Sequence, residues 1–296
     1  MEQFRNIGLI GRMGSSQVVD TLKRLKAFLF SEGYSVIIEE STAAVMPGHG
    51  AQVSSRKMLG EICDLAIVVG GDGSLLGAAR ALAGSNVPVL GVNRGRLGFL
   101  TDILPSEIED QVGEVLKGKY IEESRFLLDA YVKRDGEPIG YGCGLNDIVL
   151  HPGKSTRMIG FDLYIEGQFV NSQRSDGLIV TTPTGSTAYA LSAGGPIMHP
   201  RLDAVALVPM FPHTLSSRPI VVDGNSEIKV IIGDYNETYP HVSCDGQTHI
   251  TCAPGDTVTI GKKPQKLRLI HPMNHNFYQI CRDKLGWSSS KNDGVY

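Results

Sequence analysis

The sequence has few of the features that mark membrane, secreted or nucleic-acid-binding proteins. No apolar run approaches the ~20 residues that a transmembrane helix requires, and the first 16 residues have no long apolar stretch of the signal-peptide type. The five cysteines are scattered and form no CxxC pair, as is typical of reduced thiols. Lys and Arg number 28 against 31 Asp and Glu, so the basic excess of a nucleic-acid scaffold is missing. We therefore expect a cytoplasmic protein with no nucleic-acid or membrane partner.

Two common nucleotide-binding signatures are also missing. No GxxxxGK[ST] sequence is present, which argues against a P-loop NTPase. Gly8, Gly11 and Gly14 lack the GxGxxG spacing, which weakens a Rossmann dehydrogenase interpretation. Glycine itself is abundant, at 35 residues, and many of these glycines are clustered. Such clusters are typical of backbone loops that approach a ligand closely.

Strand and helix patterns alternate over the first 125 residues. Short apolar runs such as Asn6–Gly11 and Leu65–Val69 predict buried strands, and the spacing of apolar residues predicts helices over Ser16–Gly33, Ser74–Gly84 and Pro105–Gly118. This alternation predicts an α/β domain, residues 1–125, with a parallel, Rossmann-like, doubly wound sheet. Residues 41–56 are rich in Gly, Pro and small residues and predict a mobile loop.

The pattern of predicted secondary structure changes after about residue 125. Short β-rich segments flank Asp135-Gly136 and Glu166-Gly167, which is typical of hairpins, and Thr257–Ile260 and Leu267–Ile270 predict two of the last strands. Helical periodicity is weak except around residues 187–193. We therefore expect an all-β domain over residues 126–267, and a C-terminal segment, 268–296, that folds back on the α/β domain.

The sharpest motif is the tetrapeptide Gly70-Gly71-Asp72-Gly73, between a predicted buried strand and a predicted helix with Ser74 near its N-cap. Ligands bind at the carboxyl ends of parallel strands, and helix N-termini present free N–H groups to phosphate. A carboxylate among glycines that approach a phosphate is electrostatically unfavourable unless it holds a metal ion or accepts a proton. A plain glycine-rich turn with a helix-capping Asp72 is the structural alternative, but the position directly after a buried strand favours function.

Two further segments suit a ligand with many hydroxyls. Asn146-Asp147 follows a glycine-rich stretch and offers amide and carboxylate groups to ribose hydroxyls, although an ordinary turn fits equally well. Residues 174–196 are dense in hydroxyls and small side chains and include a predicted buried strand, Leu178–Thr182. If buried, these hydroxyls need partners, at about 1–3 kcal/mol for each one left unpaired. A ligand with hydroxyls and phosphates would supply those partners; a solvated loop is the alternative.

In this order, the three segments resemble those of the bacterial NAD kinase family. The family consists of ATP-dependent enzymes that phosphorylate the 2′-hydroxyl of the adenosine ribose of NAD to give NADP. Asn93–Asp102 and Pro212–Pro219 resemble further family signatures, and the resemblance spans roughly residues 6–270. GGDG alone is shared with lipid and sugar kinases and therefore indicates only a superfamily. The TGSTAY segment together with the Asn-Asp pair narrows the resemblance to the NAD kinase family.

The resemblance implies a role for each matching position. Asp72 is the general base toward the 2′-hydroxyl, Gly73 gives a backbone contact with NAD, and Asn146 and Asp147 hold the nicotinamide-side ribose. It assigns the binding of NAD to the all-β domain, where residues 187–192 hold the adenosine half. The other implied contacts with the dinucleotide are Arg157, Arg174, Asp176, Thr187, Ala188, Tyr189, Ala190, Leu191, Ser192 and Gln247. Arg157 also fits a solvated charge, and Asp245-Gly246 before Gln247 fits an ordinary hairpin turn.

The implied chemistry needs ATP, NAD and a divalent cation. Few cationic residues flank GGDG, so Mg²⁺ is expected to neutralise much of the phosphate charge, with ligands that the sequence does not identify. The resemblance also implies a dimer or tetramer in which Arg174 and Asp176 face the dinucleotide site of a neighbouring subunit. Two alternatives stay open: another GGDG-type kinase acting on a lipid or sugar, and a non-catalytic NAD(P)-sensing module. Because Asp72 is retained, the sequence favours catalysis.

Overall fold

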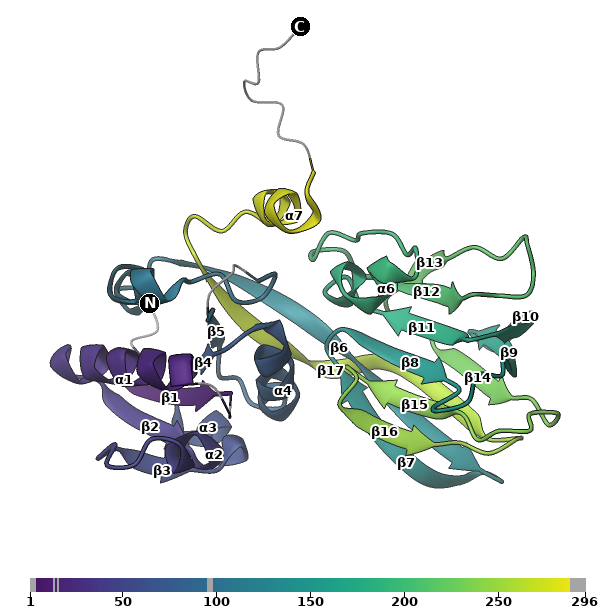
Figure 1. Ribbon diagram of the computed structural model, residues 1–296, viewed down its shortest axis with the longest axis horizontal. Helices are drawn as coiled ribbons and strands as arrows, with labels where there is room; N and C mark the ends of the chain where they lie inside the picture. The colour runs from purple at the N-terminus through teal and green to yellow at the C-terminus, as the bar shows by residue number, and fades with distance from the viewer. Residues whose placement is uncertain (1–3, 13, 15, 95–97, 288–296) are drawn as a thin grey trace, which may run out of the picture. The chain divides into compact units, whose positions relative to one another are not determined.

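The computed structural model describes residues 4–12, 14, 16–94 and 98–287. The chain forms two compact units, one made of Met1–Ser124 and Leu267–Tyr296 and the other of Arg125–Lys266 (Figure 1). Two long strands, β6 (Tyr120–Arg134) and β17 (Thr257–Pro272), contribute residues to both units. Each unit has a hydrophobic core of its own. No helix within the described ranges is long and apolar enough to cross a bilayer.

The first unit is built on a parallel sheet with the strand order β17-β5-β4-β1-β2-β3. The five strands that lie wholly in this unit are β1 (Asn6–Gly11), β2 (Ser35–Glu39), β3 (Gln52–Ser54), β4 (Leu65–Val69) and β5 (Val89–Val92). The principal helices are α1 (Ser16–Ser31), α3 (Arg56–Ile62), α4 (Asp72–Leu82) and α7 (Phe277–Leu285). All residues of β4 are buried, because the helices of a doubly wound unit cover both faces of its sheet.

Three local predictions for this unit differ from the structure in detail. The segment 41–56 is not a single loop, because the Glu39 carboxylate caps α2 (Glu40–Ala44) by accepting from Thr42 N–H at 2.9 Å, and β3 follows. The expected helix over 105–118 is a succession of η1 (Pro105–Glu107), the π-helical η2 (Ile108–Val112) and α5 (Gly113–Leu116). Helix α4 begins at Asp72, not near Ser74, because extended Gly71 is its N-cap.

The second unit is a β-sandwich. One sheet, of order β13-β12-β11-β8-β15-β16, is antiparallel throughout, and the other contains β10-β9-β14-β17 with β6 and β7 (Figure 1). Apolar side chains from both sheets form the core. Besides β6 and β17, the strands are β7 (Glu137–Gly144), β8 (Asp147–His151), β9 (Ile159–Ile165), β10 (Gln168–Ser175), β11 (Gly177–Thr181), β12 (Ala204–Met210), β13 (Ile220–Asp223), β14 (Ile228–Ile232), β15 (His241–Cys244) and β16 (Thr248–Thr251).

The two hairpins expected from Asp-Gly and Glu-Gly are present. Asp135 and Gly136 have φ values of 50° and 87°, and Glu166 and Gly167 have 51° and 72°, as a tight turn with two left-handed residues requires. The two strands expected near the end of the domain are instead one strand, β17, because no turn interrupts residues 257–272. The short helical segments η3 (Gly185–Thr187) and α6 (Tyr189–Ser192) follow β11, close to residues 187–193, where the sequence shows helical periodicity.

Candidate functional site

The GGDG loop joins the carboxyl end of β4 to the start of α4. A Cβ atom on Gly70 would lie 2.4 Å from Ser74 Oγ, so only glycine lets the first turn of α4 approach the strand this closely. The Gly70 N–H donates to Val92 O of the neighbouring β5 at 2.9 Å. Asp72 is the first residue of α4, where the helix dipole favours a negative charge. The loop therefore places one carboxylate at the strand-to-helix edge of the parallel sheet.

The Asp72 carboxylate is held by the segment that follows β5. Its Oδ2 atom accepts from Phe99 N–H at 2.9 Å, and its Oδ1 atom accepts from Leu100 N–H at 3.1 Å and from Thr101 Oγ1 at 3.0 Å. Gly98 allows this contact, because a Cβ there would lie 2.1 Å from Asp72 Oδ1. Residues 98–102 belong to the segment Asn93–Asp102, which resembles a family signature. Residues 95–97 of that segment lie outside the described residues. Three donors thus fix the orientation of Asp72.

The second unit contains a cavity of about 740 Å³ at the ends of β8, β11, β12 and β15. It brings together five of the residues predicted from the sequence: Asn146, Asp147, Asp176, Ala188 and Tyr189. Other lining residues include Val149, His151, Met210, Phe211, Ser243 and Asp245. A cavity of this size with a few convergent polar groups is typical of a small-molecule site.

Asp245 holds the Asn146-Asp147 pair in place, a role that the sequence did not reveal. Its Oδ1 atom accepts from Asn146 N–H at 2.8 Å and from Asp147 N–H at 3.3 Å, and its Oδ2 atom accepts from Leu145 N–H at 3.0 Å. Asp245 adopts a left-handed φ of 49° in the turn after β15. The only sequence signal was an Asp-Gly turn, and the bonded backbone lies about 100 residues away in the chain.

The polar side chains of Asn146 and Asp147 are available to a ligand. Asn146 Oδ1 is buried and has no hydrogen-bond partner among the described residues. Asp147 is only 5% exposed, and its burial, together with the neighbouring Asp245 charge, raises the pKa of its carboxyl to about 7. A buried acceptor without a partner is costly unless a ligand or water supplies a donor. The pair can therefore accept from hydroxyl groups in the cavity.

The hydroxyl-rich segment 181–186 does not behave as expected from the sequence. Its buried hydroxyls find partners within the protein: Thr182 Oγ1 donates to Leu145 O at 2.6 Å, and Ser186 Oγ donates to Pro183 O at 2.7 Å. Thr181 Oγ1 donates to Asn146 O at 3.0 Å. The argument that a ligand must satisfy these groups was wrong, because nearby backbone carbonyls do so. Thr181 and Thr182 thereby hold the backbone of Leu145 and Asn146 against the end of β11.

Several other predicted residues do not line the cavity. Arg157 forms an ion pair with Glu237, and both side chains are exposed. Arg174 is exposed on β10, and Gln247 lies in the β15–β16 turn, where its N–H donates to Cys244 O at 3.0 Å. The side chain of Ala190 lies in a core cluster, so a ligand contact there would use its backbone.

The remaining members of the predicted set occupy different places. Thr187 and Leu191 are partly buried in η3 and α6. Exposed Ser192 borders a separate cavity of about 270 Å³. In the first unit, Gly73 follows Asp72 in the first turn of α4, and a Cβ there would meet no neighbouring atom. The space beside Gly73 fits the expected backbone contact.

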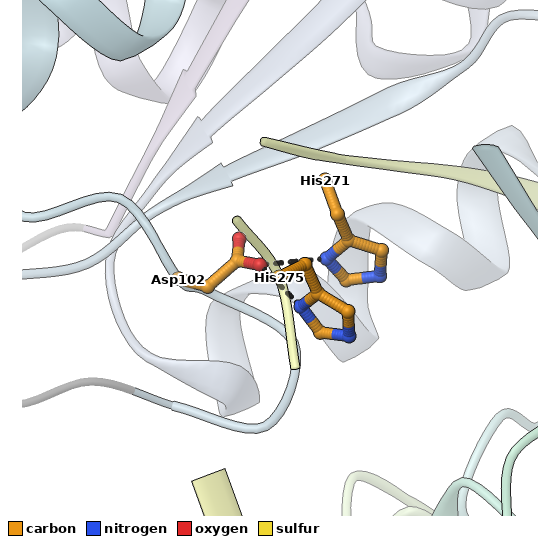
Figure 2. Close-up of side chains that lie close together, drawn as sticks. All are labelled: Asp102, His271 and His275. Atoms are coloured by element: carbon orange, nitrogen blue, oxygen red, sulfur yellow. Dashed lines mark hydrogen bonds and ion pairs between the residues drawn. The ribbon is translucent and has the colours of Figure 1, made fainter. Parts of the chain in front are cut away.

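Among the described residues, one group of side chains could hold a metal ion. The candidate ligand atoms of Asp102, His271 and His275 lie within 4.8 Å of one another (Figure 2). The sequence does not reveal this group: His271 and His275 are four residues apart, but Asp102 lies about 170 residues before them, so no local motif joins the three. Two imidazoles suit zinc, whereas Mg²⁺ prefers oxygen ligands, so the group does not match the expected magnesium.

Comparisons with known proteins cover nearly the whole chain. The ATP-NAD kinase N-terminal domain family matches residues 7–120, and the ATP-NAD kinase C-terminal domain family matches residues 145–272. The chain is 88% identical over 294 residues to an NAD kinase of Hahella chejuensis, an alignment that covers 99% of each chain. It is 73% identical over 289 residues to an NAD kinase of Marinobacter nauticus, covering 98% of each.

Two solved structures are similar to the chain. A yeast NADH kinase complexed with NADH has a TM-score of 0.88 at 25% identity, covering 99% of this chain and 91% of the other. An NAD kinase from Archaeoglobus fulgidus in complex with ATP has a TM-score of 0.70 at 26% identity, covering 95% and 97%. These comparisons confirm the predicted fold class, an α/β domain plus an all-β domain. Since both domain families match and its relatives align over almost their full length, the chain belongs to the ATP-NAD kinase family.

Proposed function

We propose that the chain transfers the γ-phosphoryl group of ATP to the 2′-hydroxyl of the adenosine ribose of NAD, with Asp72 as the general base. The observation that carries this assignment is the Asp72 carboxylate, fixed by three donors at the strand-to-helix edge. A ribose hydroxyl is a weak nucleophile at neutral pH, so a carboxylate that accepts its proton as the O–P bond forms is worth about 10²–10⁴ in rate. Membership of the NAD kinase family supports NAD as the acceptor.

The cavity of the second unit is the proposed NAD site. Asn146 Oδ1 and the Asp147 carboxylate accept hydrogen bonds from the hydroxyls of the nicotinamide-side ribose, and Ala188 and Tyr189 contact the rest of the dinucleotide. The buried acceptor without a partner in the protein supports this role. The assignments of Gly73, Arg157, Arg174, Thr187, Ala190, Leu191, Ser192 and Gln247 rest on the family resemblance.

Mg²⁺ is the proposed counterion of the transferred phosphates. The three donors recorded on Asp72 are all neutral, so they do not offset the charge of a nucleotide. Phosphoryl transfer depends on such neutralisation, and Mg²⁺ bound through the phosphates commonly supplies it.

Self-association into a dimer or tetramer is proposed as well. In the loop after β12, Phe211 and Leu215 are 81% and 96% exposed, and the adjoining His213 N–H donates to Arg174 O at 2.9 Å. Exposed apolar side chains of this kind often mark a protein interface. If Arg174 and Asp176 face a neighbouring subunit's dinucleotide site, refolding Asp72→Asn together with Asp176→Ala should restore part of the activity in mixed oligomers. No recovery, with mixed species confirmed by mass spectrometry, would contradict the shared site.

An acceptor assay with γ-labelled ATP tests the proposed reaction. NAD, NADH, a diacylglycerol and fructose 6-phosphate are supplied in parallel, with and without excess EDTA. We expect label transfer to NAD, loss of turnover with EDTA, and recovery with added Mg²⁺. Transfer to the lipid or the sugar but not to NAD would identify a different GGDG-type kinase. Binding of NAD without any transfer would identify a sensor, and full turnover in EDTA would exclude the metal.

A further inference from the structure

The segment 98–103 connects Asp72 to the C-terminal part of the chain, all within the first unit. Its Phe99, Leu100 and Thr101 donate the three hydrogen bonds to the Asp72 carboxylate. Buried Asn93 Nδ2 donates to Thr101 Oγ1 at 2.8 Å, which orients that hydroxyl. The three hydrogen bonds to Asp72 therefore form only while this segment keeps its position beside β5.

The next residue, Asp102, is hydrogen-bonded to two histidines from the C-terminal segment, His271 and His275. These three residues form the Asp102 clasp. Its Oδ2 atom lies 2.8 Å from His271 Nδ1 and 2.7 Å from His275 Nδ1, and the two imidazole rings are stacked 3.8 Å apart (Figure 2). The two bonds from the imidazoles lower the pKa of the Asp102 carboxyl against the effect of its burial. An ionised carboxylate only accepts, so both Nδ1 atoms carry hydrogen and donate.

A second contact supports the same segment. Phe99, which donates to Asp72, lies with its ring centroid 6.4 Å from that of Phe277 at the start of α7. The C-terminal segment thus holds residues 99–102 at both ends, by an aromatic pair and by the Asp102 clasp. All three Asp102, His271 and His275 side chains are at most 6% exposed, so solvent screens their interactions little.

The distances fit hydrogen bonds better than metal coordination. Two ligands around a tetrahedral zinc ion with bonds of about 2.0–2.1 Å lie about 3.3 Å apart. Both Nδ1 atoms instead lie within 2.8 Å of a single oxygen of Asp102. One observation leaves a metal worth testing: the other oxygen, Oδ1, is buried with no hydrogen-bond partner among the described residues. The experiment below therefore includes a metal analysis.

We infer that Asp102, His271 and His275 are positioning residues for phosphoryl transfer, which act through residues 99–101 on the orientation of the Asp72 carboxylate. The inference rests on the proposed role of Asp72. The clasp itself touches no reacting group. A general base must lie within hydrogen-bond reach of its proton, and a misplacement of about 1 Å can cost about 10²-fold in rate.

Substitutions of His275 separate the donor from the ring. His275→Phe keeps a ring to stack on His271 but removes the Nδ1 donor, whereas His275→Asn places an amide donor near the Nδ1 position. We expect His275→Phe to lower kcat about 10-fold with KM for NAD changed less than about 2-fold, and His275→Asn to recover most of kcat. His49→Phe is the matched control, since His49 lies between α2 and β3 of the same unit. Thermal unfolding verifies that each variant is folded.

A double-mutant cycle shows whether the effect passes through Asp72. If it does, His275→Phe should change kcat less than about 2-fold in an Asp72→Asn background, because the carboxylate that it positions is already lost. Equal losses in both backgrounds, or no loss of kcat with His275→Phe alone, would overturn the inference. A wild-type kcat for Asp72→Asn would instead defeat the proposed function. Elemental analysis should find no stoichiometric zinc after dialysis. If zinc is retained and its removal abolishes activity, Asp102, His271 and His275 form a metal centre and the inference is overturned.

Discussion

Two loops with an acidic side chain at a strand end are held in opposite ways. In the first unit, Asp72 is itself the acceptor that binds the neighbouring segment, through Phe99, Leu100 and Thr101. In the second unit, a separate carboxylate, Asp245, binds the backbone of the loop. The Asn146 and Asp147 side chains are thereby left to the cavity. In the first loop one residue combines the structural bonds with the proposed chemistry, whereas in the second the structural bonds and the proposed ligand contacts belong to different residues.

This difference decides what a substitution can show. A change at Asp72 removes the proposed general base and a structural acceptor together, so its effect on rate must be compared with a control for the structural part. A change at Asp147 should affect the ligand directly and leave the loop in place, whereas a change at Asp245 should displace the loop and weaken ligand binding through it.

The largest expected effect is that of Asp72→Asn. We expect kcat to fall by about 10²–10⁴, because the amide cannot accept the proton of the hydroxyl. Asp64→Asn is the matched control: Asp64 Oδ2 accepts from Arg5 N–H and Asn6 N–H at 2.8 Å in the same unit. Steady-state kinetics and thermal unfolding of both variants should show similar stability losses but a loss of rate in Asp72→Asn alone. Equal losses of kcat would assign Asp72 a structural role.

Asp245→Ala should have the second-largest effect. It leaves the N–H groups of Leu145, Asn146 and Asp147 without their acceptor, at about 1–3 kcal/mol for each group left unsatisfied. We expect the KM for NAD to rise about 10-fold or more, since 1.4 kcal/mol is about tenfold in affinity. Asp223→Ala is the control, because Asp223 likewise accepts from a turn N–H, that of Asn225, at 2.8 Å. An unchanged KM with Asp245→Ala would show that the loop keeps its place without this bond.

Asn146→Ala and Asp147→Ala should have a smaller effect, mainly on binding. Each removes one group that is proposed to bind a ribose remote from the reacting hydroxyl. We therefore expect KM for NAD to rise about 3- to 10-fold, with a smaller loss of kcat if this contact also positions the substrate. Isothermal titration with NAD and steady-state kinetics measure the two effects. If neither variant changes the affinity for NAD, the pair is structural.

A further effect concerns the stability of the fold and its dependence on pH. The carboxyl of Asp147 has a pKa of about 7 in the folded chain, against about 3.9 when unfolded. The folded state therefore holds this proton more tightly, and its contribution lowers the free energy of unfolding as pH rises from about 4 to about 7. Asp147→Asn should flatten this slope, as measured by thermal unfolding at pH 5, 6 and 7. Identical slopes in both proteins would show that Asp147 does not titrate in this range.

The sequence predicted those features that depend on local patterns. Alternating strands and helices in the first unit and the Asp135-Gly136 turn in the second follow from periodicity and from residues that tolerate a left-handed φ. The GGDG motif was placed correctly at the end of β4, because a buried apolar run precedes it. The start of α4 was missed by two residues, since Gly71 gives no capping side chain to recognise.

What the sequence could not predict depends on contacts between distant segments. Asp245 binds a loop about 100 residues away, and Asp102 binds histidines about 170 residues away, so neither forms a motif. The hydroxyls of residues 181–186 were assigned to a ligand, because the acceptors at Leu145 and Asn146 lie in the turn between β7 and β8 and are invisible in the local sequence.

A single-turnover experiment tests the role of Asp72 most directly. Enzyme in excess over NAD is mixed with labelled ATP and Mg²⁺, and the formation of NADP is followed by rapid quenching in wild type and Asp72→Asn. The account predicts that the chemical step slows by about 10²–10⁴ while the dissociation constant for NAD stays within about 3-fold of wild type. A chemical step at the wild-type rate in Asp72→Asn, with NAD bound, would contradict it.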